Sequence, residues 1–540
     1  MAATHEVTNQ PPPLSDYDVF STDEALVEGV QRHNAGWATE NLADLGRRAG
    51  STEWQERGRL ANFNPPQLVT YDRYGHRIDE VEFHPAWHEL MTVAVENGLH
   101  AGAWADPKPG ANVARAAAFA IWSHTEGGHG CPISMTHAAV PALRAGDPAL
   151  AAEWEPRLMS KVYDPGLRTP SEKAGCLAGM GMTEKQGGSD VRTNSTRAVP
   201  AADGTYRLTG HKWFTSAPMC DVFLVLAQAP GGLTCFLVPR VLPDGTRNTF
   251  KIQRLKDKLG NKSNASSEPE FDDTVAWRLG DEGAGVRTII EMVTSTRLDC
   301  VIGTTTLMRE AVAQATHHAR HRQAFGRYLA DQPLMRMVLA DLALESEAAT
   351  TLMTRLAAAV DDDEGAFKRV GLAVGKYWVC KRGPNVAAEA LECFGGNGFV
   401  EDFPMAMLYR EAPLNSIWEG SGNVNVLDVL RGLAREPGAW EAFRNEVALA
   451  AGADARLDAS AKALDEEITD TTDIEVRARR LVEHMALVLQ GSLLVRFAPP
   501  AVADAFCASR LGGDWGHAFG TLPSGVDTAA IVERATPKVG

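Results

Sequence analysis

The sequence predicts a mainly α-helical protein with a central antiparallel β domain. Three observations lead to this fold class. Apolar residues recur at helical spacing over 1–175 and again from residue 281 onward. Between these regions, residues 176–280 are rich in Val, Phe, Thr and Gly, in short runs separated by turns. The length of 540 residues, with 44% apolar content, suffices for several domains and a large buried core.

The first 175 residues divide into an extended arm and a helical domain. The arm spans residues 1 to about 20, where Pro11-Pro12-Pro13 excludes helix. Such an arm is either disordered or laid along a partner subunit. Ser21-Thr22-Asp23-Glu24 is a helix start signal, and the sequence from there through residue 175 predicts an all-helical layer.

Residues 176–280 form the predicted β domain. The runs 221–226 (DVFLVL) and 233–238 (LTCFLV) have the aliphatic and aromatic composition of strands. The segment 229–232 (APGG) between them has the chemistry of a tight turn, as does 243–245 (PDG). Short strands joined by tight turns predict antiparallel pairing.

Helices return after residue 280 and predict two further regions. Leu334, Leu342, Leu352 and Leu356 keep helical spacing over several turns, and helices of this length usually pack as an antiparallel bundle. We therefore expect a C-terminal bundle of the four-helix type over 281–437. After a Pro-Gly boundary, residues 438–540 are expected to form a helical extension that packs on the core and caps an oligomer.

Composition excludes several classes of function. The net charge of −16 argues against bulk binding to nucleic acid or to an anionic membrane. Eight scattered cysteines without a CxxC pair fit a reduced compartment, and neither a disulfide framework nor a zinc site. No apolar run reaches the roughly 18 residues of a membrane span, and the N-terminus has no secretory pattern. We therefore expect a cytoplasmic protein without membrane contact.

One carboxylate stands out, that of Glu419 in the run 415–423 (NSIWEGSGN), which forms a turn just before a predicted helix. Gly420 and Gly422 allow a ligand to approach the backbone closely. The N–H groups at the helix start favour a nearby anion. Beside Trp418 the carboxylate would be desolvated, which raises its pKa towards the range useful for a base. The pattern indicates a proton abstractor next to a phosphate or carbonyl site, or else an ordinary helix-capping carboxylate.

Four other runs each allow a functional and a plain structural interpretation. The loop 181–191 (GMTEKQGGSDV) can hold a flavin edge or a pyrophosphate, or be only a turn. The run 210–216 (GHKWFTS), expected on a strand, also fits an ordinary β core. Arg322 in 321–327 can clamp a phosphate or be a solvated cation at a helix end. The glycine-rich break 392–399 can be only a helix C-cap and turn.

Together, these five runs resemble the acyl-CoA dehydrogenase family over about residues 170–432. The shared motifs are its TExxxGSD loop, its WFT strand, its RxxFG run, its GGxGF loop and its EG turn. The runs MTEKQGGSDV, GHKWF, RLKDKLGNKSNASSE, CKRG and NSIWEGSGN, with NQPPPL, RLANFNPPQL and FHPAWHELM near the N-terminus, resemble the AidB-like branch more closely. The resemblance covers nearly the whole chain. It implies an N-terminal helical domain, a β-barrel domain and a C-terminal helical bundle.

The resemblance implies an FAD-dependent dehydrogenase of fatty acid metabolism that acts on acyl-CoA. Glu419 is then the base that removes the α-proton of an acyl thioester, and a β-hydride passes to FAD, giving a trans-2-enoyl-CoA. Some members carry the base at the position before Arg297, which is Thr296 here and cannot serve. The family's electron acceptor is an electron-transfer flavoprotein.

The same motifs imply further site residues. The expected flavin contacts are Met182, Thr183, Ser189, Phe214, Thr215, Ser216, Gly395, Gly396, Ile417, Trp418, Gly420, Ser421 and Asn423. Arg322, Phe325 and Gln332 match positions that reach the FAD of a neighbouring subunit, which implies a homo-oligomer, commonly a tetramer. The expected substrate contacts are Ser189, Arg297, Trp418 and Gly420.

Two positions depart from the family pattern. Trp418 stands where the family often carries Tyr, and a larger ring narrows or reshapes the acyl pocket. Lys185-Gln186-Gly187-Gly188 replaces the usual Pro-Gly-Ala-Gly of the loop.

The AidB-like branch is also associated with binding of double-stranded DNA through its C-terminal region and with alkylation stress. Residues 439–540 contain 10 Lys and Arg against 15 Asp and Glu, and Arg477, Arg479 and Arg480 are their one basic cluster. Phosphate neutralisation drives most non-specific affinity, so this acidic region disfavours DNA as a partner. The alternative functions are a DNA-binding, alkylation-response flavoprotein with weak dehydrogenase activity, and an oxidase that passes electrons to oxygen.

Overall fold

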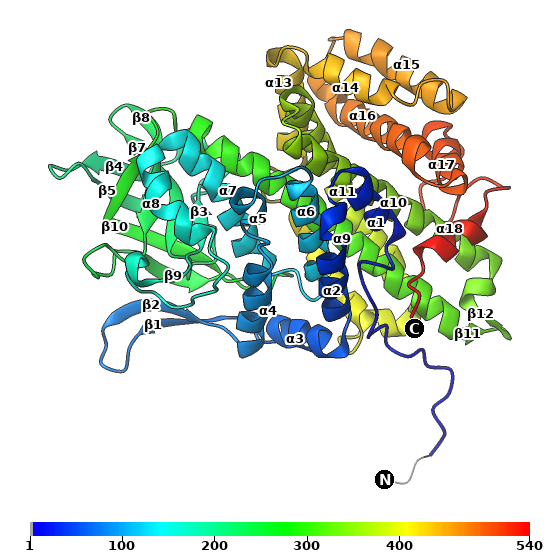
Figure 1. Cartoon of the computed structure of the whole chain (residues 1–540), viewed down its shortest axis with the longest axis horizontal. Helices are drawn as coiled ribbons and strands as arrows, with labels where there is room; N and C mark the ends of the chain where they lie inside the picture. Colours follow the sequence, from blue (N-terminus) through cyan, green and yellow to red (C-terminus); the bar gives the residue numbers. More distant parts are fainter. Residues whose placement is uncertain (1–3, 540) are drawn as a thin grey trace. The chain divides into compact units, whose positions relative to one another are not determined.

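The computed structural model describes residues 4–539, which group into two units (Figure 1). The helical unit runs through Thr52, includes Asn112–His124 and continues from Cys300 to the C-terminus. The sheet unit comprises Glu53–Ala111 and Thr125–Asp299. Each unit therefore combines segments that are far apart in the sequence, whereas the four regions expected from composition are consecutive.

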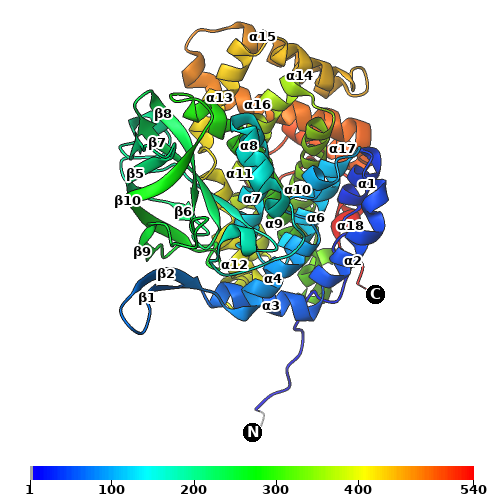
Figure 2. The same ribbon diagram turned by 60° about the vertical axis from the view of Figure 1, so that its left-hand side comes forward.

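An eight-stranded sheet forms the core of the sheet unit, within the region predicted to be β (Figure 2). Its strands are β3 (Ala178–Gly181), β4 (Arg197–Pro200), β5 (Tyr206–His211), β6 (Thr215–Ser216), β7 (Val222–Ala229), β8 (Gly232–Pro239), β9 (Lys251–Leu255) and β10 (Ser266–Leu279). The 14 residues of β10 pair with β5, β6, β8 and β9, always antiparallel. In contrast to the prediction, β3 and β7 pair in parallel, because the long connection between them allows a crossover.

A β-hairpin interrupts the part of the sheet unit that was expected to be all helical. β1 (Gln67–Tyr71) and β2 (Arg77–Glu82) pair antiparallel. Their turn is stabilised by Asp72, whose carboxylate accepts a hydrogen bond from the N–H of Tyr74, and by Gly75 at φ +88°. The expected helices surround the hairpin in the sequence: α3 (Thr52–Phe63), α4 (Pro85–Glu96), α5 (Gly102–Ala105), α7 (Gly130–Gly146) and α8 (Pro148–Leu158).

Long helices build the helical unit, as the apolar periodicity predicts. They are α1 (Glu24–Arg32), α2 (Thr39–Ala49), α6 (Ala111–Ser123), α9 (Gly285–His321), α10 (Pro333–Asp361), α11 (Gly365–Glu392), α12 (Pro404–Glu411) and α13 (Gly422–Arg435). On α10, Leu342, Leu352 and Leu356 are fully buried, whereas Leu334 in the first turn is 83% exposed. α11 packs against both α10 and α13, and it also contacts the short helix Leu414–Ser416 that precedes Glu419.

The region after α13 is helical, as expected for an extension. Its elements are α14 (Ala439–Ala448), α15 (Ala455–Thr469), α16 (Ile474–Phe497), α17 (Pro500–Phe506) and α18 (Thr528–Ala535). On α18, Arg534 pairs with Glu24 at 2.8 Å and Glu28 at 2.7 Å, both on α1, and with Glu347 at 3.0 Å on α10. Within residues 4–539, no helix is both long enough and apolar enough to cross a bilayer.

A buried ionic cluster joins the extension to α10. Arg510 has a fully buried side chain and pairs with Asp341 and, at 2.9 Å, with Glu345. Arg382 on α11 also reaches Glu345, at 3.1 Å. Burial opposes ionisation of Glu345, but the charges of Arg382 and Arg510 hold its pKa below the ordinary value. These charges anchor the extension, because a buried charge that lost its partner would destabilise the fold.

We expect Arg510→Ala to lower the free energy of unfolding by about 3–5 kcal/mol, because it removes a cation from two buried carboxylates. Arg444→Ala is the matched control, since Arg444 pairs with Asp465 on the surface and its side chain is 55% exposed. That change should cost about 1 kcal/mol or less. Urea-induced unfolding measures both, and equal effects of the two substitutions would contradict the buried-cluster interpretation.

Candidate functional site

Glu419 lies in a strained turn between the short helix Leu414–Ser416 and α13. The sequence predicts a helix after this turn, and α13 begins at Gly422, within the run 415–423. Its φ is +55°, in the left-handed region, and Gly420 has φ +94°. A residue with a side chain pays about 1–3 kcal/mol for such a conformation, which persists only where the surroundings impose it. The turn is the kind of strained backbone that clusters at functional sites.

Two buried side chains hold the carbonyl groups of this turn. Lys376 of α11 is 1% exposed, and its Nζ donates to the carbonyl oxygen of Trp418 at 2.7 Å and to that of Gly420. Asn425 of α13 is fully buried and donates to the carbonyl oxygens of Gly420 and Ser421. Sequence reasoning missed both donors. The available signal for Lys376 was a lone charged residue inside the apolar run 371–380 (GLAVGKYWVC).

The other predicted residues of this turn differ in exposure. Trp418 is half-buried, and its indole N–H donates to Asn415 Oδ1 at 2.8 Å. Ser421 is half-buried, Ile417 is 64% exposed and Asn423 is exposed at the start of α13. The aromatic ring beside Glu419 is therefore fixed by a hydrogen bond within the turn itself.

In the sheet unit, a buried ion pair ties the loop 182–189 to the sheet. Glu184 and Lys212 both have fully buried side chains and meet at 2.8 Å. Glu184 also accepts a hydrogen bond from the N–H of Ser195 at 2.6 Å, and Lys212 donates to the carbonyl oxygen of Leu226 at 2.7 Å. Burial opposes ionisation of Glu184, but the charge and hydrogen bond of Lys212 and the Ser195 N–H hold its pKa well below the ordinary value.

The predicted residues of this loop are connected to the run 213–216. The carbonyl oxygen of Thr183 accepts a hydrogen bond from the N–H of Trp213 at 2.8 Å. The carbonyl oxygen of Met182 accepts one from the side chain of Asn194 at 2.8 Å. Ser189 is exposed. The structure thus brings two of the motifs, far apart in the sequence, into direct contact.

The run 213–216 is not a continuous strand, contrary to the prediction. Trp213 and Phe214 lie between β5 and β6, because the N–H of Trp213 bonds to the loop instead of to a neighbouring strand. Phe214 is 51% exposed, and the hydroxyl of Ser216 lies 3.3 Å from that of Ser266. Thr215 is 1% exposed, and its hydroxyl has no hydrogen-bond partner within residues 4–539. A buried hydroxyl of this kind in a native structure usually forms a hydrogen bond with an ordered water or a ligand.

A third group of predicted residues lies where α9 ends. Arg322 precedes a hairpin of β11 (Gln323–Ala324) and β12 (Arg327–Tyr328). Phe325 at its tip is fully exposed with φ +52°, and Gln332 closes the hairpin by donating to the carbonyl oxygen of Ala324 at 3.0 Å. The hairpin therefore presents an exposed aromatic ring at its tip, and the side chain of Gln332 is bonded to its backbone.

The N-terminal arm lies against this hairpin of its own chain. Arg322 donates to the carbonyl oxygen of Asn9 at 2.6 Å, and the Asn9 side chain exchanges two hydrogen bonds with the backbone of Gln323. Asn397 Nδ2 donates to Gln10 at 3.3 Å, close in sequence to the exposed pair Gly395-Gly396. Of the two alternatives expected for the arm, these contacts oppose disorder around Asn9 and Gln10, and the placement of the arm along a partner subunit stays a prediction.

Arg297, the expected support of the active-site wall, is buried on α9 with 6% exposure. Thr296 beside it is 3% exposed and its hydroxyl donates to the carbonyl oxygen of Val293. The predicted residues thus occupy the loop and strand ends of the sheet unit, the first half of α9, the hairpin after α9 and the turn before α13.

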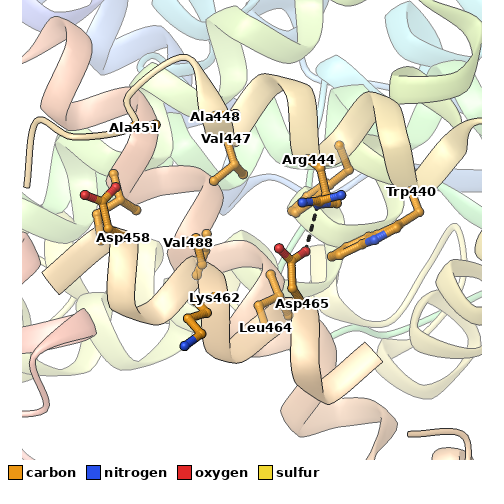
Figure 3. A pocket seen from close by; sticks show the side chains of 13 residues that line it. Trp440, Arg444, Val447, Ala448, Ala451, Asp458, Lys462, Leu464, Asp465 and Val488 are labelled. Carbon is orange, nitrogen blue, oxygen red and sulfur yellow. Dashed lines mark ion pairs between the residues drawn. The ribbon is translucent and has the colours of Figure 1, made fainter. Parts of the chain in front are cut away.

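A separate cavity of about 250 Å³ lies in the extension, between α14, α15 and α16. Its walls are mainly apolar and include Phe443, Val447 and Val488. Figure 3 shows the ion pair between Arg444 and Asp465, at 2.8 Å, that links α14 to α15 beside it. None of the residues expected to bind flavin or substrate lines this cavity.

Three family models match successive parts of the chain. Residues 9–165 match the adaptive response protein AidB N-terminal domain. Residues 179–274 match the acyl-CoA dehydrogenase middle domain, and residues 283–434 match the acyl-CoA dehydrogenase C-terminal domain. The boundaries of the last two matches fall close to those of the β domain and the bundle.

Known relatives extend this likeness over nearly the whole chain. The AidB protein of Escherichia coli (strain K12) is 46% identical over 513 residues, which cover 94% of each chain. Acyl-CoA dehydrogenase family member 11 of Caenorhabditis elegans is 32% identical over 499 residues, covering 84% of this chain and 79% of its own. The crystal structure of Caenorhabditis elegans ACDH-11 in complex with C11-CoA matches with a TM-score of 0.86 at 27% identity, over 94% of each chain. The chain therefore has the predicted fold and belongs to the acyl-CoA dehydrogenase family, in its AidB-like branch.

Proposed function

We propose that this chain is an FAD-dependent acyl-CoA dehydrogenase that converts an acyl-CoA to a trans-2-enoyl-CoA. The observation that carries the proposal is the strained turn in which one carboxylate, Glu419, is set between two carbonyl groups bound by Lys376. Backbone strain of this kind is typically kept where function requires it. The crystal structure of ACDH-11 holds C11-CoA, which supports acyl-CoA as the class of substrate.

Glu419 is the general base in this mechanism. A C–H bond next to a thioester is a weak acid, so breaking it requires a positioned base and donors that polarise the thioester oxygen. The family resemblance assigns one of these donors to the backbone N–H of Glu419 itself. The α-proton passes to the Glu419 carboxylate, and the family resemblance assigns substrate contacts to Trp418, Gly420 and Arg297. Thr296 carries no carboxylate, which leaves Glu419 as the base.

The loop and strand ends of the sheet unit fit a flavin. Thr183 and Ser189 offer hydroxyl groups, and the hydroxyl of Thr215 is buried and unpartnered within the described residues. The loop is tightly closed, since a Cβ on Gly188 would lie 2.3 Å from Thr183 Oγ1. The family resemblance assigns flavin contacts to Met182, Phe214 and Ser216 of the sheet unit, and separately to Ile417, Ser421 and Asn423 in the turn before α13. When bound, FAD accepts the hydride from the β-carbon and so supplies the redox chemistry.

We also propose that the chain works as a homo-oligomer, with a tetramer as the expected form and an electron-transfer flavoprotein as its electron acceptor. Phe325 is fully exposed and Phe399 is 83% exposed. Exposed large apolar side chains of this kind mark contact surfaces when they gather on one face. In such an oligomer, Arg322, Phe325 and Gln332 would reach the FAD of a neighbouring subunit, next to Gly395-Gly396.

Electrostatics disfavour the alternative function as a DNA-binding protein. Two arginines of the one basic cluster in the extension are engaged within the chain. Arg477 donates to the carbonyl oxygen of Thr472 and pairs with Asp470 at 3.3 Å, and Arg479 donates to the hydroxyl of Tyr377. Arginines bound in this way contribute little to phosphate neutralisation, which is the main source of non-specific affinity for DNA.

We expect Glu419→Gln to retain FAD but to slow anaerobic bleaching of the flavin by acyl-CoA at least about 100-fold, because an amide cannot accept the α-proton. Stopped-flow absorbance with short, branched and long acyl-CoAs measures the rate. Glu436→Gln is the matched control, since Glu436 is an exposed carboxylate at the other end of α13. Failure of every acyl-CoA to bleach the wild-type flavin would contradict the proposed function.

We expect Lys212→Met to lower the FAD content of the purified protein, because it leaves Glu184 buried without its cation and releases the loop. Breaking a buried pair in this way costs about 3–5 kcal/mol. The folded-state pKa of Glu184 is lowered, so the pair stabilises the fold above the ordinary value of 4.5 and is lost as pH falls below it. Lys251→Met, which breaks an exposed pair with Asp272, is the control. Equal FAD content in both variants would contradict this role.

A further inference from the structure

Lys376 lies in the buried middle of α11, where a charged side chain is rare unless it is paired with acceptors. Its side chain is among the largest fully buried ones of the described chain. Removing an ammonium group from water is costly unless good acceptors replace the water. The two acceptors of Lys376 are the carbonyl oxygens of Trp418 and Gly420, and neither is a carboxylate. If the side chain only filled space in the core, the uncharged methionine would fill it equally well.

These two acceptors flank Glu419 on both sides. One belongs to the peptide group that carries the N–H of Glu419, and the other follows Glu419 by one residue. Asn425 donates a second hydrogen bond to the carbonyl of Gly420, so this oxygen is fixed from two directions. Fixing both carbonyls leaves Glu419 no freedom to leave its left-handed φ of +55° without breaking a buried hydrogen bond.

The planarity of the peptide bond then determines where the N–H of Glu419 points. In a trans peptide the C=O and the N–H lie in one plane and point in opposite directions. Because Lys376 draws the carbonyl of Trp418 towards α11, the N–H of Glu419 is aimed away from α11. A cation on the carbonyl also polarises the peptide and strengthens its N–H as a donor. The ammonium therefore acts on the group that is expected to polarise the thioester.

We propose that Lys376 is a positioning residue for α-proton abstraction, which rests on the function proposed above for Glu419. Lys376 fixes the Trp418–Glu419 peptide so that its N–H faces the thioester oxygen while the Glu419 carboxylate faces the α-carbon. The α C–H bond breaks, its proton passes to the carboxylate, and its electron pair is delocalised onto the thioester oxygen that the N–H binds. Lys376 itself touches neither substrate nor cofactor.

The test separates proton abstraction from hydride transfer. The probe is the 3-thia analogue of whichever acyl-CoA bleaches the wild type fastest, because sulfur at the β-position leaves the α-proton removable but supplies no hydride. Exchange of the α-hydrogen in D2O, followed by NMR on the FAD-loaded protein, reports the action of Glu419 alone. Isothermal titration gives the Kd of the same probe. The matched control is Lys368→Met, on the same helix, where the ammonium pairs with Asp363 at 3.3 Å.

We expect Lys376→Met to slow α-hydrogen exchange about 100-fold, the loss typical of a small misplacement at a reacting centre. The Kd of the probe and the FAD content should stay within about threefold of wild type, because only an interaction specific to the transition state is removed. Lys376→Gln keeps a neutral donor and should lose only about tenfold. Lys368→Met should exchange at the wild-type rate.

Exchange at the wild-type rate in either Lys376 variant overturns the proposal, and Lys376→Gln decides it if Lys376→Met does not fold. A loss of affinity for the probe as large as the loss in exchange rate also overturns the proposal, because that pattern indicates a general packing defect. If the wild type exchanges no α-hydrogen, the proposed function fails instead. Amide hydrogen exchange of residues 417–422, measured by mass spectrometry, then decides the role of Lys376: faster exchange in Lys376→Gln supports it and unchanged exchange removes it.

Discussion

The cost of burying an ammonium group is the constraint that shapes the loop 182–189 and the turn at Glu419. Lys212 and Lys376 are each almost completely buried, and each donates to at least one acceptor in an irregular segment: Lys212 to Glu184, besides the carbonyl oxygen of Leu226 on β7, and Lys376 to Trp418 and Gly420. Lys212 holds the loop 182–189 on the sheet through Glu184, and Lys376 holds the carbonyls around Glu419. The loop has only the single bridge between Glu184 and Gly187, and the turn at Glu419 has no strand pairing, so the buried charge supplied by a neighbouring strand end or helix contributes to the conformation of each.

Local patterns in the sequence identify the elements but not these partners. Helical periodicity predicts α10, and the composition of residues 176–280 predicts the β domain, because both signals are carried by neighbouring residues. The turn at Glu419 is also predictable from its glycines and the helix that follows. Lys376 lies 43 positions before Glu419, and nothing in the spacing of two such residues reveals that they meet. The parallel pairing of β3 with β7 is equally non-local, since it depends on a crossover.

The extension is part of the helical unit and is joined to it by buried charges. Arg510 anchors it to α10, and Glu446 of α14 joins Arg355 of α10 to Arg496 of α16 at 2.7 Å each. The charged residues of the extension are therefore not all on its surface, because several of them form buried ion pairs. The composition of the sequence therefore argues against DNA binding, but it does not reveal which charged residues form buried ion pairs.

Arg479 of α16 donates to the Tyr377 hydroxyl at 3.2 Å, and Tyr377 directly follows Lys376 in the chain. A Cβ added to Gly422, the first residue of α13, would lie 3.6 Å from the same tyrosine ring. A chain cut after α13 would therefore lose the hydrogen-bond partner of a tyrosine that neighbours Lys376, so the extension and the support of the turn at Glu419 are not structurally independent.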